Sequence, residues 1–414
     1  MKIGLLAYHS ACNFGATLQL LSTYMYLINH QHQPIIINWV PDDLDRLYFS
    51  TTPSSQYNFQ KHLRQSLWQE TRHCRTSEDV SEVISQEGIE AVIIGSDAVA
   101  QHHPWLESIV FPCKTIVGFR KYTSDMVFPN PFWANWLTML KRPIPIAFMS
   151  VSNQDSAFKL IPRKVRSRMG EQIRHFAYVS VRDDWTRQMF LHLTKGQYNP
   201  AITPDPVFAF NQNAAKLLPS KESLLNRFHL PEKYLLMSFL PSAFQSQTAV
   251  SSLQEWLNRF IGIAESKGLA CVSLPFSQCA GIGISSHTIQ HPLNPIDWYA
   301  LIKHSCGYVG NNMHPIIVSL HNSVPFFSFD NYGTSHLNGL YVDESTSKIK
   351  HILDTANMAD YRISCTSRHF KAPTPEKVHQ LLDGFNKEKC SEFANMQLNK
   401  YNLMMDSIMQ SFNQ

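Results

Sequence analysis

Residues 13–19 read Asn13-Phe14-Gly15-Ala16-Thr17-Leu18-Gln19, and they follow an apolar run, Lys2-Ile3-Gly4-Leu5-Leu6-Ala7. This order predicts a strand, a short loop and then a helix. Gly15 lets the backbone approach a ligand closely, and the unpaired amides of a helix N-terminus bind anions. The loop has one glycine where the dinucleotide-binding fingerprint has three. The pattern favours an α/β fold with an anionic ligand over a nicotinamide dehydrogenase, unless Asn13 only caps the helix.

Composition limits the classes of protein that fit. The chain has 414 residues, of which 44% are hydrophobic and 16% charged, with a net charge of +4. This length suits two domains, and the small positive charge gives no support for nucleic-acid binding. No run of about 18 apolar residues is present, so we expect no transmembrane segment. The eight cysteines lack metal-site spacing, and we expect reduced thiols, no metal and a cytoplasmic location.

Apolar runs alternate with helical patterns in both halves of the chain, as in a parallel sheet covered on both faces. We expect a first Rossmann-like domain over 1–210, a linker over 211–232, a second domain over 233–375 and a helical tail over 376–414 that packs back on the first domain. The two domains would face each other across a cleft. The predicted strands lie at 2–7, 35–40, 91–94, 144–150, 178–182, 234–240, 270–274, 307–309 and 324–329.

Two stretches interrupt this alternation. Residues 41–80 and 102–142 are long, and the second is rich in aromatic residues and proline. Excursions of this length are typical of binding loops or lids.

Candidate site residues follow the expected strands, because ligands of α/β sheets bind beyond the carboxyl ends. Pro315 suits the first turn of a helix, which makes His314 the expected cap. Its imidazole and the amides of Ile316 and Ile317 would form a phosphate seat, or His314 touches only protein. A lone metal is not expected to join His314 to His321, which lies about two turns on.

Two charged residues are candidates for the same edge. Asp97 follows Gly95-Ser96 and is either a general base or a partner of a loop amide. Arg182 either holds a carboxylate or phosphate, or pairs with Asp183 or Asp184 at the surface. Asp205, between two prolines, reads as a turn residue.

Taken together, several segments resemble the polysaccharide pyruvyl transferase family. The matching pieces, in order, are Asn13-Phe14-Gly15-Ala16 with Leu18-Gln19, Val92-Ile93-Ile94-Gly95-Ser96-Asp97, Val179-Ser180-Val181-Arg182-Asp183, Pro204-Asp205-Pro206, and Asp297-Trp298-Tyr299 leading to Gly310-Asn311-Asn312-Met313-His314-Pro315. The resemblance implies two Rossmann-like domains in a glycosyltransferase-B-like arrangement. It also implies transfer of pyruvate from phosphoenolpyruvate to two hydroxyls of a saccharide or lipid-linked glycan, for cell-surface or exopolysaccharide synthesis.

The resemblance also assigns site residues. His314, Asp97 and Arg182 would be catalytic, and substrate binding would involve Asn13, Gly15, Ser96, Asn311 and Asn312. It implies no cofactor and no metal, with phosphoenolpyruvate as a donor substrate. It is compatible with a cytoplasmic enzyme, either free or peripheral at the inner membrane face. The acceptor side would belong to the first domain and the donor side to the second.

Two departures from the family pattern leave alternatives open. Many relatives carry arginine or serine at the position of Asn312, and many continue Ser-Asp with Gln-Val-Trp, where this chain has Ala98-Val99-Ala100. Loss of an arginine weakens a grip on phosphate, unless Arg182, Lys303 or another basic residue compensates. The alternatives are a nucleotide-sugar glycosyltransferase on the same scaffold and a non-catalytic glycan-binding relative.

Overall fold

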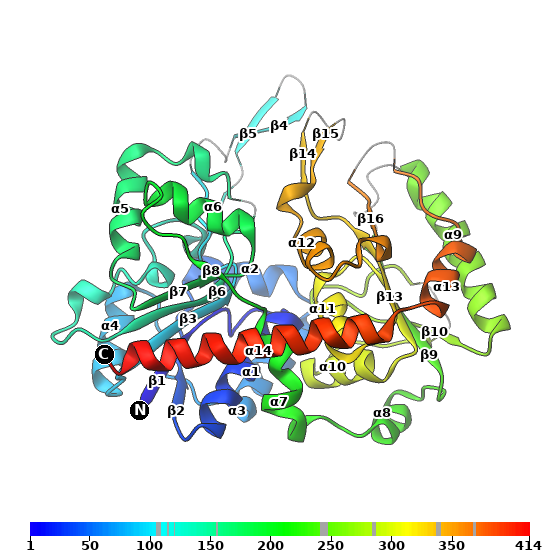
Figure 1. Ribbon diagram of the computed structural model, residues 1–414, viewed down its shortest axis with the longest axis horizontal. Helices are drawn as coiled ribbons and strands as arrows, with labels where there is room; N and C mark the ends of the chain where they lie inside the picture. Colours follow the sequence, from blue (N-terminus) through cyan, green and yellow to red (C-terminus); the bar gives the residue numbers. More distant parts are fainter. Residues whose placement is uncertain are drawn as a thin grey trace.

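The computed structural model describes residues 1–104, 109–113, 116–119, 121–154, 156–240, 247–283, 287–336, 341–366 and 370–414. They form two lobes that lie side by side, and each lobe contains a six-stranded parallel sheet (Figure 1). Helices cover both faces of each sheet. The predicted strands are confirmed with ends that shift by up to three residues, except that the second strand is shorter and earlier than expected.

In the first lobe, helices connect the parallel strands of the sheet. Its strands, in spatial order, are β2 (Gln33–Ile36), β1 (Lys2–Leu6), β3 (Ala91–Asp97), β6 (Ile146–Val151), β7 (Tyr178–Val181) and β8 (Ala201–Ile202). The helices are α1 (Phe14–Asn29), α2 (Asp42–Thr51), α3 (Ser54–Leu67), α4 (Ser77–Gln86), α5 (Arg163–Ile173) and α6 (Asp184–Leu193). In β3, Ile93 packs into one core and Val92 and Ile94 into the core on the opposite face, which explains the continuous apolar run.

The second lobe repeats this architecture. Its strand order is β11 (His287–Thr288), β10 (Ala270–Ser273), β9 (Tyr234–Ser238), β12 (Gly307–Gly310), β13 (Phe326–Asp330) and β16 (Arg362–Ser364). Its helices are α9 (Gln247–Ser266), α10 (Pro295–His304), α11 (Met313–Asn322), α12 (Lys348–Thr355) and α13 (Pro375–Asp383). Two antiparallel hairpins complete the described strands, β4 (Ile109–Cys113) with β5 (Ile116–Phe119), and β14 (Thr334–His336) with β15 (Tyr341–Asp343).

The lobes share a hydrophobic core. A single cluster of buried side chains runs from Ile3 and Leu18 of the first lobe to Leu236 and Ile316 of the second. At the contact between α1 and α10, the rings of Phe14 and Trp298 lie 5.4 Å apart. The segment 211–232, expected as a linker, contains most of α7 (Phe210–Ala214) and all of α8 (Lys221–Phe228). Packing across this shared core fixes the edges of the two sheets relative to each other.

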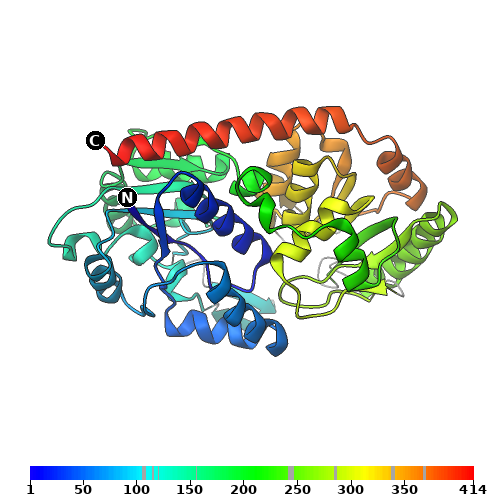
Figure 2. The same cartoon turned by 90° about the horizontal axis from the view of Figure 1, so that it is seen from below.

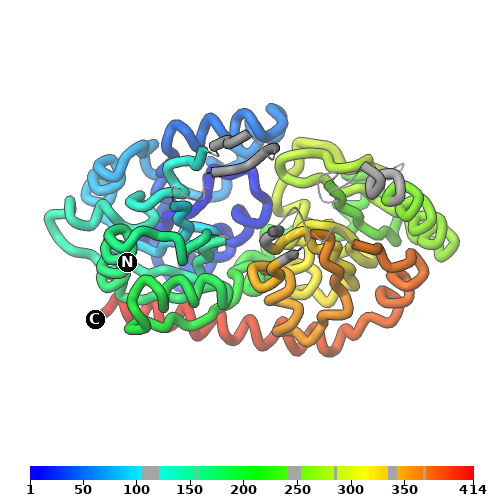
Figure 3. The backbone as a smooth tube through the Cα atoms, turned by 90° about the horizontal axis from the view of Figure 1, so that it is seen from above, coloured from blue at the N-terminus to red at the C-terminus, as the bar shows by residue number. Residues whose placement is uncertain are grey.

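The C-terminal helix α14 (Lys387–Phe412) lies across both lobes, as Figure 1, Figure 2 and Figure 3 show. Near its start, the thiol of Cys390 donates to the carbonyl of Leu320 in α11 at 3.1 Å. Farther along, the Tyr401 hydroxyl accepts from Asn213 Nδ2 at 3.2 Å. The expected single helical tail is thus two helices, because α13 ends at Asp383 and α14 begins after its cap, Asn386.

The expectation of loops over 41–80 is wrong for most of that stretch. Helices α2 and α3 occupy it, each beginning directly after a proline, Pro41 or Pro53. Residues 102–142 contain β4, β5 and several short 3₁₀ turns, and residues 105–108, 114–115 and 120 of that stretch lie outside the described part. The helices of the first stretch form a wall beside the carboxyl ends of β1 and β2.

Candidate active site

A cavity of about 240 Å³ lies between the lobes, beyond the carboxyl ends of both sheets. We call it the central cavity. Its lining residues come from Asn13, Asp97, Gln154 and Arg182 in the first lobe and from Leu240, Phe276, Ser277, Gln278, Cys279, Asn312, Met313, His314, Tyr332 and Lys348 in the second. Of the predicted site residues, it thus gathers Asn13, Asp97, Arg182, Asn312 and His314. The other three predicted residues, Gly15, Ser96 and Asn311, lie beside the central cavity and do not line it.

His314 does not cap its helix, and that prediction is wrong. Helix α11 begins at Met313, and its cap is the extended residue Asn312, whose side chain makes no capping hydrogen bond. Pro315 is therefore the third helical residue, which a helix tolerates because amides of the first turn have no intrahelical partner. His314 consequently lies within the first turn of α11, with its side chain at the boundary between the lobes.

The ring of His314 packs against Gly15 at the start of α1. A Cβ atom at position 15 would lie 2.2 Å from three ring atoms of His314, which is impossible for real atoms. The glycine expected to admit a ligand therefore admits a histidine from the other lobe. Asn13 both lines the cavity and caps α1, since its Oδ1 accepts from the amide of Ala16 at 3.3 Å.

The imidazole of His314 stays neutral at pH 7. Burial lowers its pKa, and Arg182 and Lys348 act in the same direction, whereas the carboxylates of Asp205 and Asp97 oppose them. Its Nε2 atom is buried and makes no hydrogen bond with a side chain or backbone of the described residues. A neutral ring with an unused nitrogen can accept a proton, and the imidazolium formed can then donate it.

Arg182 is the charged centre of the cavity wall. Its guanidinium lies 3.0 Å from Asp205 Oδ2 and 3.4 Å from Asp97 Oδ1, and the side chain is only 7% exposed. The surface pairing with Asp183 or Asp184, considered from the sequence, is replaced by these buried ion pairs. Burial raises the pKa of Asp97, but the charges of Arg182 and Lys348, together with a hydrogen bond from the amide of Ala98, outweigh it, so the net shift is downward.

Asp205 is more than the turn residue that its sequence context indicates. Its side chain is buried and accepts from Gln19 Nε2 at 2.5 Å and from the amide of Val207 at 3.0 Å. Together with the ion pair to Arg182, these bonds connect α1, β7 and the segment after β8. The segment Pro204-Asp205-Pro206 thus positions Arg182. This role can be recognised only from the folded structure, where Asp205 and Arg182 form an ion pair.

Asn311 and Ser96, both predicted to bind substrate, are buried beside the cavity and do not line it. Asn311 is buried, accepts from the amide of Leu240 at 3.2 Å and donates to the carbonyl of Phe329 at 2.8 Å. It therefore holds together the carboxyl ends of β9 and β13. Ser96 is also buried, and its Oγ atom has no hydrogen-bond partner among the described residues.

Lys348 is the cation that sequence reasoning missed. It is the first residue of α12, whose cap Ser347 donates to Asp330 Oδ2 at 2.5 Å. Lys303, suggested as a compensating base, instead donates to Asn211 Oδ1 at 2.9 Å and does not line the cavity. The only available signal for Lys348 was a serine cap followed by lysine at the start of an amphipathic helix.

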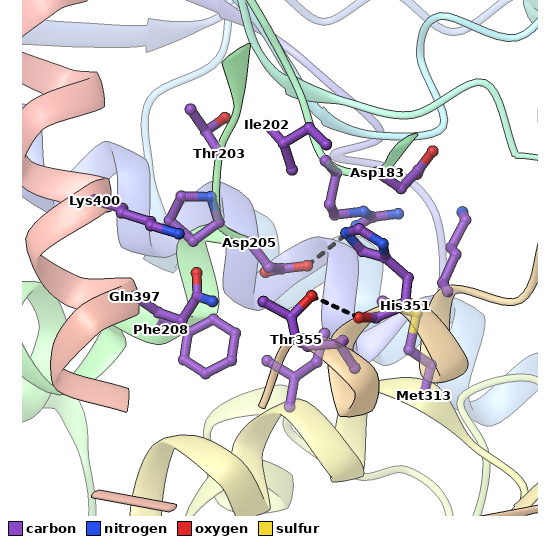
Figure 4. Close-up of a pocket in the computed structure, with 15 residues that line it drawn as sticks. Asp183, Ile202, Thr203, Asp205, Phe208, Met313, His351, Thr355, Gln397 and Lys400 are labelled. Carbon is purple, nitrogen blue, oxygen red and sulfur yellow. Dashed lines mark hydrogen bonds and ion pairs between the residues drawn. The ribbon is translucent and has the colours of Figure 1, made fainter. Parts of the chain in front are cut away.

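A second hollow, the rear cavity, lies behind Arg182 and also measures about 240 Å³. It shares Arg182, Met313 and Lys348 with the central cavity. Figure 4 shows Lys400 and Gln397 of α14 on the side opposite His351. Arg182 thus separates two compartments and has Asp205 at its back.

Neither metal clusters nor membrane spans are found in the described part of the chain. No group of three or more His, Cys, Asp or Glu side chains there is arranged to hold a metal ion. The cysteines at 12, 74, 271, 279, 306, 365 and 390 are free thiols. Among the described helices, none is both long and apolar enough to cross a bilayer.

Two solved structures illustrate the similarity of the fold. The UDP-GlcNAc 2-epimerase of Neisseria meningitidis bound to UDP-GlcNAc is 9% identical with a TM-score of 0.51, covering 99% of this chain and 100% of its own. The UDP-N-acetylglucosamine 2-epimerase of Rickettsia bellii is 9% identical with a TM-score of 0.50, covering 100% and 96%. This similarity confirms the predicted fold, two Rossmann-like domains in a glycosyltransferase-B-like arrangement.

Sequence comparison identifies the family. No curated protein matches the chain. The sequence pattern of one family, polysaccharide pyruvyl transferase, matches residues 13–332. This range spans both lobes and contains Asn13, Asp97, Arg182 and His314 of the central cavity. The chain therefore belongs to the polysaccharide pyruvyl transferase family.

Proposed function

We propose that this protein transfers pyruvate from phosphoenolpyruvate to two hydroxyls of a saccharide or lipid-linked glycan, forming a cyclic ketal and releasing phosphate. The observation that carries the proposal is the position of His314 beside Arg182, Asp97 and Lys348 in a cavity between the lobes. Membership of the family supports the same reaction class. The acceptor would lie against the first lobe and the donor against the second, in the cytoplasm or at the inner membrane face.

The reaction needs an acid, a base and a holder for phosphate. A proton is added to the methylene carbon of the donor, which makes the neighbouring carbon cationic. One saccharide hydroxyl adds to that carbon, the bond to the phosphate oxygen breaks, and the second hydroxyl closes the ketal. One hydroxyl proton replaces the proton given to the methylene carbon, and the other leaves with inorganic phosphate. Each proton transfer is a task for a positioned side chain.

In our proposal His314 supplies the methylene proton. The neutral ring takes up a proton from a saccharide hydroxyl, and Nε2 has no hydrogen bond to occupy it among the described residues. The imidazolium formed in this way is the acid that protonates the methylene carbon, and the lowered pKa of the ring makes it a stronger acid. Its fixed contact with Gly15 restricts the ring to one orientation, which favours transfer at a defined point.

Arg182 and Lys348 supply positive charge for the donor's phosphate and carboxylate. The ionised Asp97, whose pKa is lowered, stabilises the cationic carbon or orients a sugar hydroxyl. Asn312, where many relatives have arginine, adds only a neutral hydrogen bond. We therefore expect weak donor binding compared with an arginine-bearing relative.

Phosphate release from phosphoenolpyruvate tests the proposal. The protein is incubated with a panel of free and lipid-linked glycans, and mass spectrometry detects the ketal product. We expect both signals with one acceptor class, and loss of both with His314→Gln at unchanged folding. Unchanged turnover in His314→Ala removes the assigned role of the histidine.

Two results would replace the proposal. Transfer from a labelled nucleotide sugar, without phosphate release from phosphoenolpyruvate, identifies a glycosyltransferase. Thermal stabilisation by glycans with no effect of phosphoenolpyruvate identifies a non-catalytic binding protein. Each measurement uses the intact chain and separates the three candidate functions.

A further inference from the structure

A third cavity, about 200 Å³ in volume, lies wholly within the first lobe and outside the central cavity. We call it the α3 pocket. It lies beyond the carboxyl ends of β1 and β2, where this fold class binds ligands, and α3 forms one wall. The lining residues that matter are Ser10, Asn38, Tyr57, Lys61, Arg64 and His73.

The guanidinium of Arg64 is the unusual group in this pocket. The side chain is only 14% exposed, and its Nε and Nη1 atoms are buried without a hydrogen bond to the described residues. The carboxylate of Glu70 lies 3.8 Å from Nε, and Glu70 already accepts from Trp68 Nε1 at 2.8 Å. A shielded guanidinium with unused donors is costly unless an anion completes it.

The other groups around Arg64 leave it available for such an anion. Lys61 lies three residues earlier on α3, on the same helix face, and is exposed at the pocket. One carboxylate, Asp45, also lines the pocket, and it accepts from the Tyr57 hydroxyl at 2.9 Å. His73 is also committed, because its Nε2 bonds to the carbonyl of Val40 at 2.9 Å. Arg64 and Lys61 thus form a two-cation edge, and planar carboxylates and phosphates match an arginine fork.

The α3 pocket is close to the central cavity. Ser10 lines the first and Asn13 lines the second, and three residues of chain span at most about 10 Å. Helix α3 is also fixed against the second lobe: Gln56 donates to the carbonyl of Leu293 at 3.0 Å and accepts from its amide at 2.7 Å. The separation is therefore short enough for one acceptor molecule to span, and the two bonds of Gln56 hold α3 in place.

We propose that the α3 pocket binds an anionic substituent of the acceptor saccharide, a carboxylate or a phosphate, through Arg64 and Lys61. This rests on the proposed function in one respect, since it takes the acceptor to be the molecule that reaches His314. The shared chemistry is an oxyanion. Its source is either a uronic acid residue of the glycan or the phosphate of a lipid-linked precursor.

Direct binding tests the pocket without phosphoenolpyruvate. Glucuronate and inorganic pyrophosphate are each titrated into the intact protein by calorimetry or by NMR. We expect saturable binding of one probe, weakened at least tenfold by Arg64→Gln and less by Arg64→Lys. Arg46→Gln, at an exposed arginine of α2 that does not line the pocket, is the matched control and should bind normally.

Binding at the central cavity is recognised with Lys348→Gln. Binding that Arg64→Gln removes and Lys348→Gln leaves intact supports the α3 pocket. Binding that only Lys348→Gln removes, or no binding of either probe, overturns it. Thermal unfolding of each variant shows whether a loss reflects misfolding, and the milder Arg64→Lys variant provides the measurement if Arg64→Gln is unstable.

Kinetics then separates this proposal from the proposed function. With an acidic acceptor, we expect Arg64→Gln to raise KM for the acceptor about tenfold and leave KM for phosphoenolpyruvate unchanged. Pyruvyl transfer that does not change in Arg64→Gln contradicts the proposal for the α3 pocket and leaves the proposed function supported. Anion binding that depends on Arg64, without any pyruvyl transfer, supports the α3 pocket and contradicts the proposed function. The preferred probe, glucuronate or pyrophosphate, identifies the source of the oxyanion.

Discussion

Gly15 and His314 form a contact that tolerates no added atom. In Gly15→Ala, the new methyl group would have to displace the imidazole, because the ring atoms lie 2.2 Å from the Cβ position. Displacement by about 1 Å at a reacting group costs roughly 100-fold in rate, so we expect kcat to fall by that order. Overpacking of this buried contact outweighs the higher helix propensity of alanine, so we also expect a loss of stability of about 1–3 kcal/mol.

The control for this change is Gly262→Ala. Gly262 lies in α9 and is exposed, and a Cβ there meets no atom within 4 Å. Alanine should stabilise the fold by up to about 1 kcal/mol and leave the rate unaltered. Equal activity of Gly15→Ala and wild type would contradict the assigned contact.

Asp205 is expected to contribute stability through its buried ion pair with Arg182. An asparagine at this position could still accept from the amide of Val207 but would lose the charge that faces Arg182 at 3.0 Å. Removing one partner of a buried pair typically costs 3–5 kcal/mol, and for Asp205→Asn we expect about 3 kcal/mol because Asp97 remains near Arg182. Urea unfolding measures this difference. An unchanged unfolding midpoint would show that Arg182 does not depend on Asp205.

Asn312 offers a gain-of-function test of donor binding. An arginine at this position lines the central cavity and adds a charged hydrogen-bond donor. A hydrogen bond to a charged group is worth about 1.5 kcal/mol or more, which is roughly tenfold in affinity. We therefore expect Asn312→Arg to lower KM for phosphoenolpyruvate about tenfold. Initial rates at varied donor concentration decide this, and a raised KM would show that the donor does not lie near position 312.

At the scale of elements, α11 should make the fold sensitive to acid. Burial lowers the pKa of His321 from 6.5 to about 3, with Lys303 adding to the effect. The unfolded chain takes up this proton below pH 6.5 while the folded chain does not, so stability is complete above pH 6.5 and is lost as pH falls. The cost is about 3 kcal/mol at pH 4 and about 4 kcal/mol at pH 3.

Denaturant unfolding between pH 7 and pH 4 measures this effect. We expect His321→Gln to flatten the dependence on pH in that range, since glutamine has no proton to take up. The ring lies near Phe208 and Tyr299, so the variant should also be less stable at pH 7. A slope identical to that of wild type would assign the acid sensitivity to other groups.

The sequence predicted the position of a site residue where a single element determines it, and failed where packing between elements determines it. Asp97 and Arg182 were predictable because the ends of parallel strands meet at one edge of a sheet. Helices α2 and α3 were missed although Pro41 and Pro53 mark their starts, because their polar composition hides the apolar period. Lys348 was out of reach, since its place depends on the bond between Ser347 and Asp330.

The contact between Gly15 and His314 shows the same difference between local sequence and packing. Its sequence context indicates a close approach to the backbone, and only the arrangement of the lobes shows that His314 makes that approach. The α3 pocket likewise combines residues of α3 with residues that follow β1 and β2. Such contacts join parts of the chain that no local pattern connects.

At the scale of the whole molecule, α14 joins the lobes through buried apolar side chains. Met405 is fully buried and belongs to the core that runs through both lobes. Met405→Ala should cost about 2–5 kcal/mol, as for other buried methionines. Leu403→Ala, at a side chain that is 66% exposed on the same helix, should change stability by less than about 0.5 kcal/mol. Thermal and urea unfolding compare the two, and equal effects would exclude a structural role for that helix face.

A long helix fixed at both ends also restricts how the two halves can move. A clam-shell swing that widens the gap between them would have to bend α14 or tear Cys390 from Leu320 and Tyr401 from Asn213. The shared hydrophobic core resists the same movement from the inside. We therefore expect a bulky glycan to enter, and the product to leave, through an opening of nearly constant width.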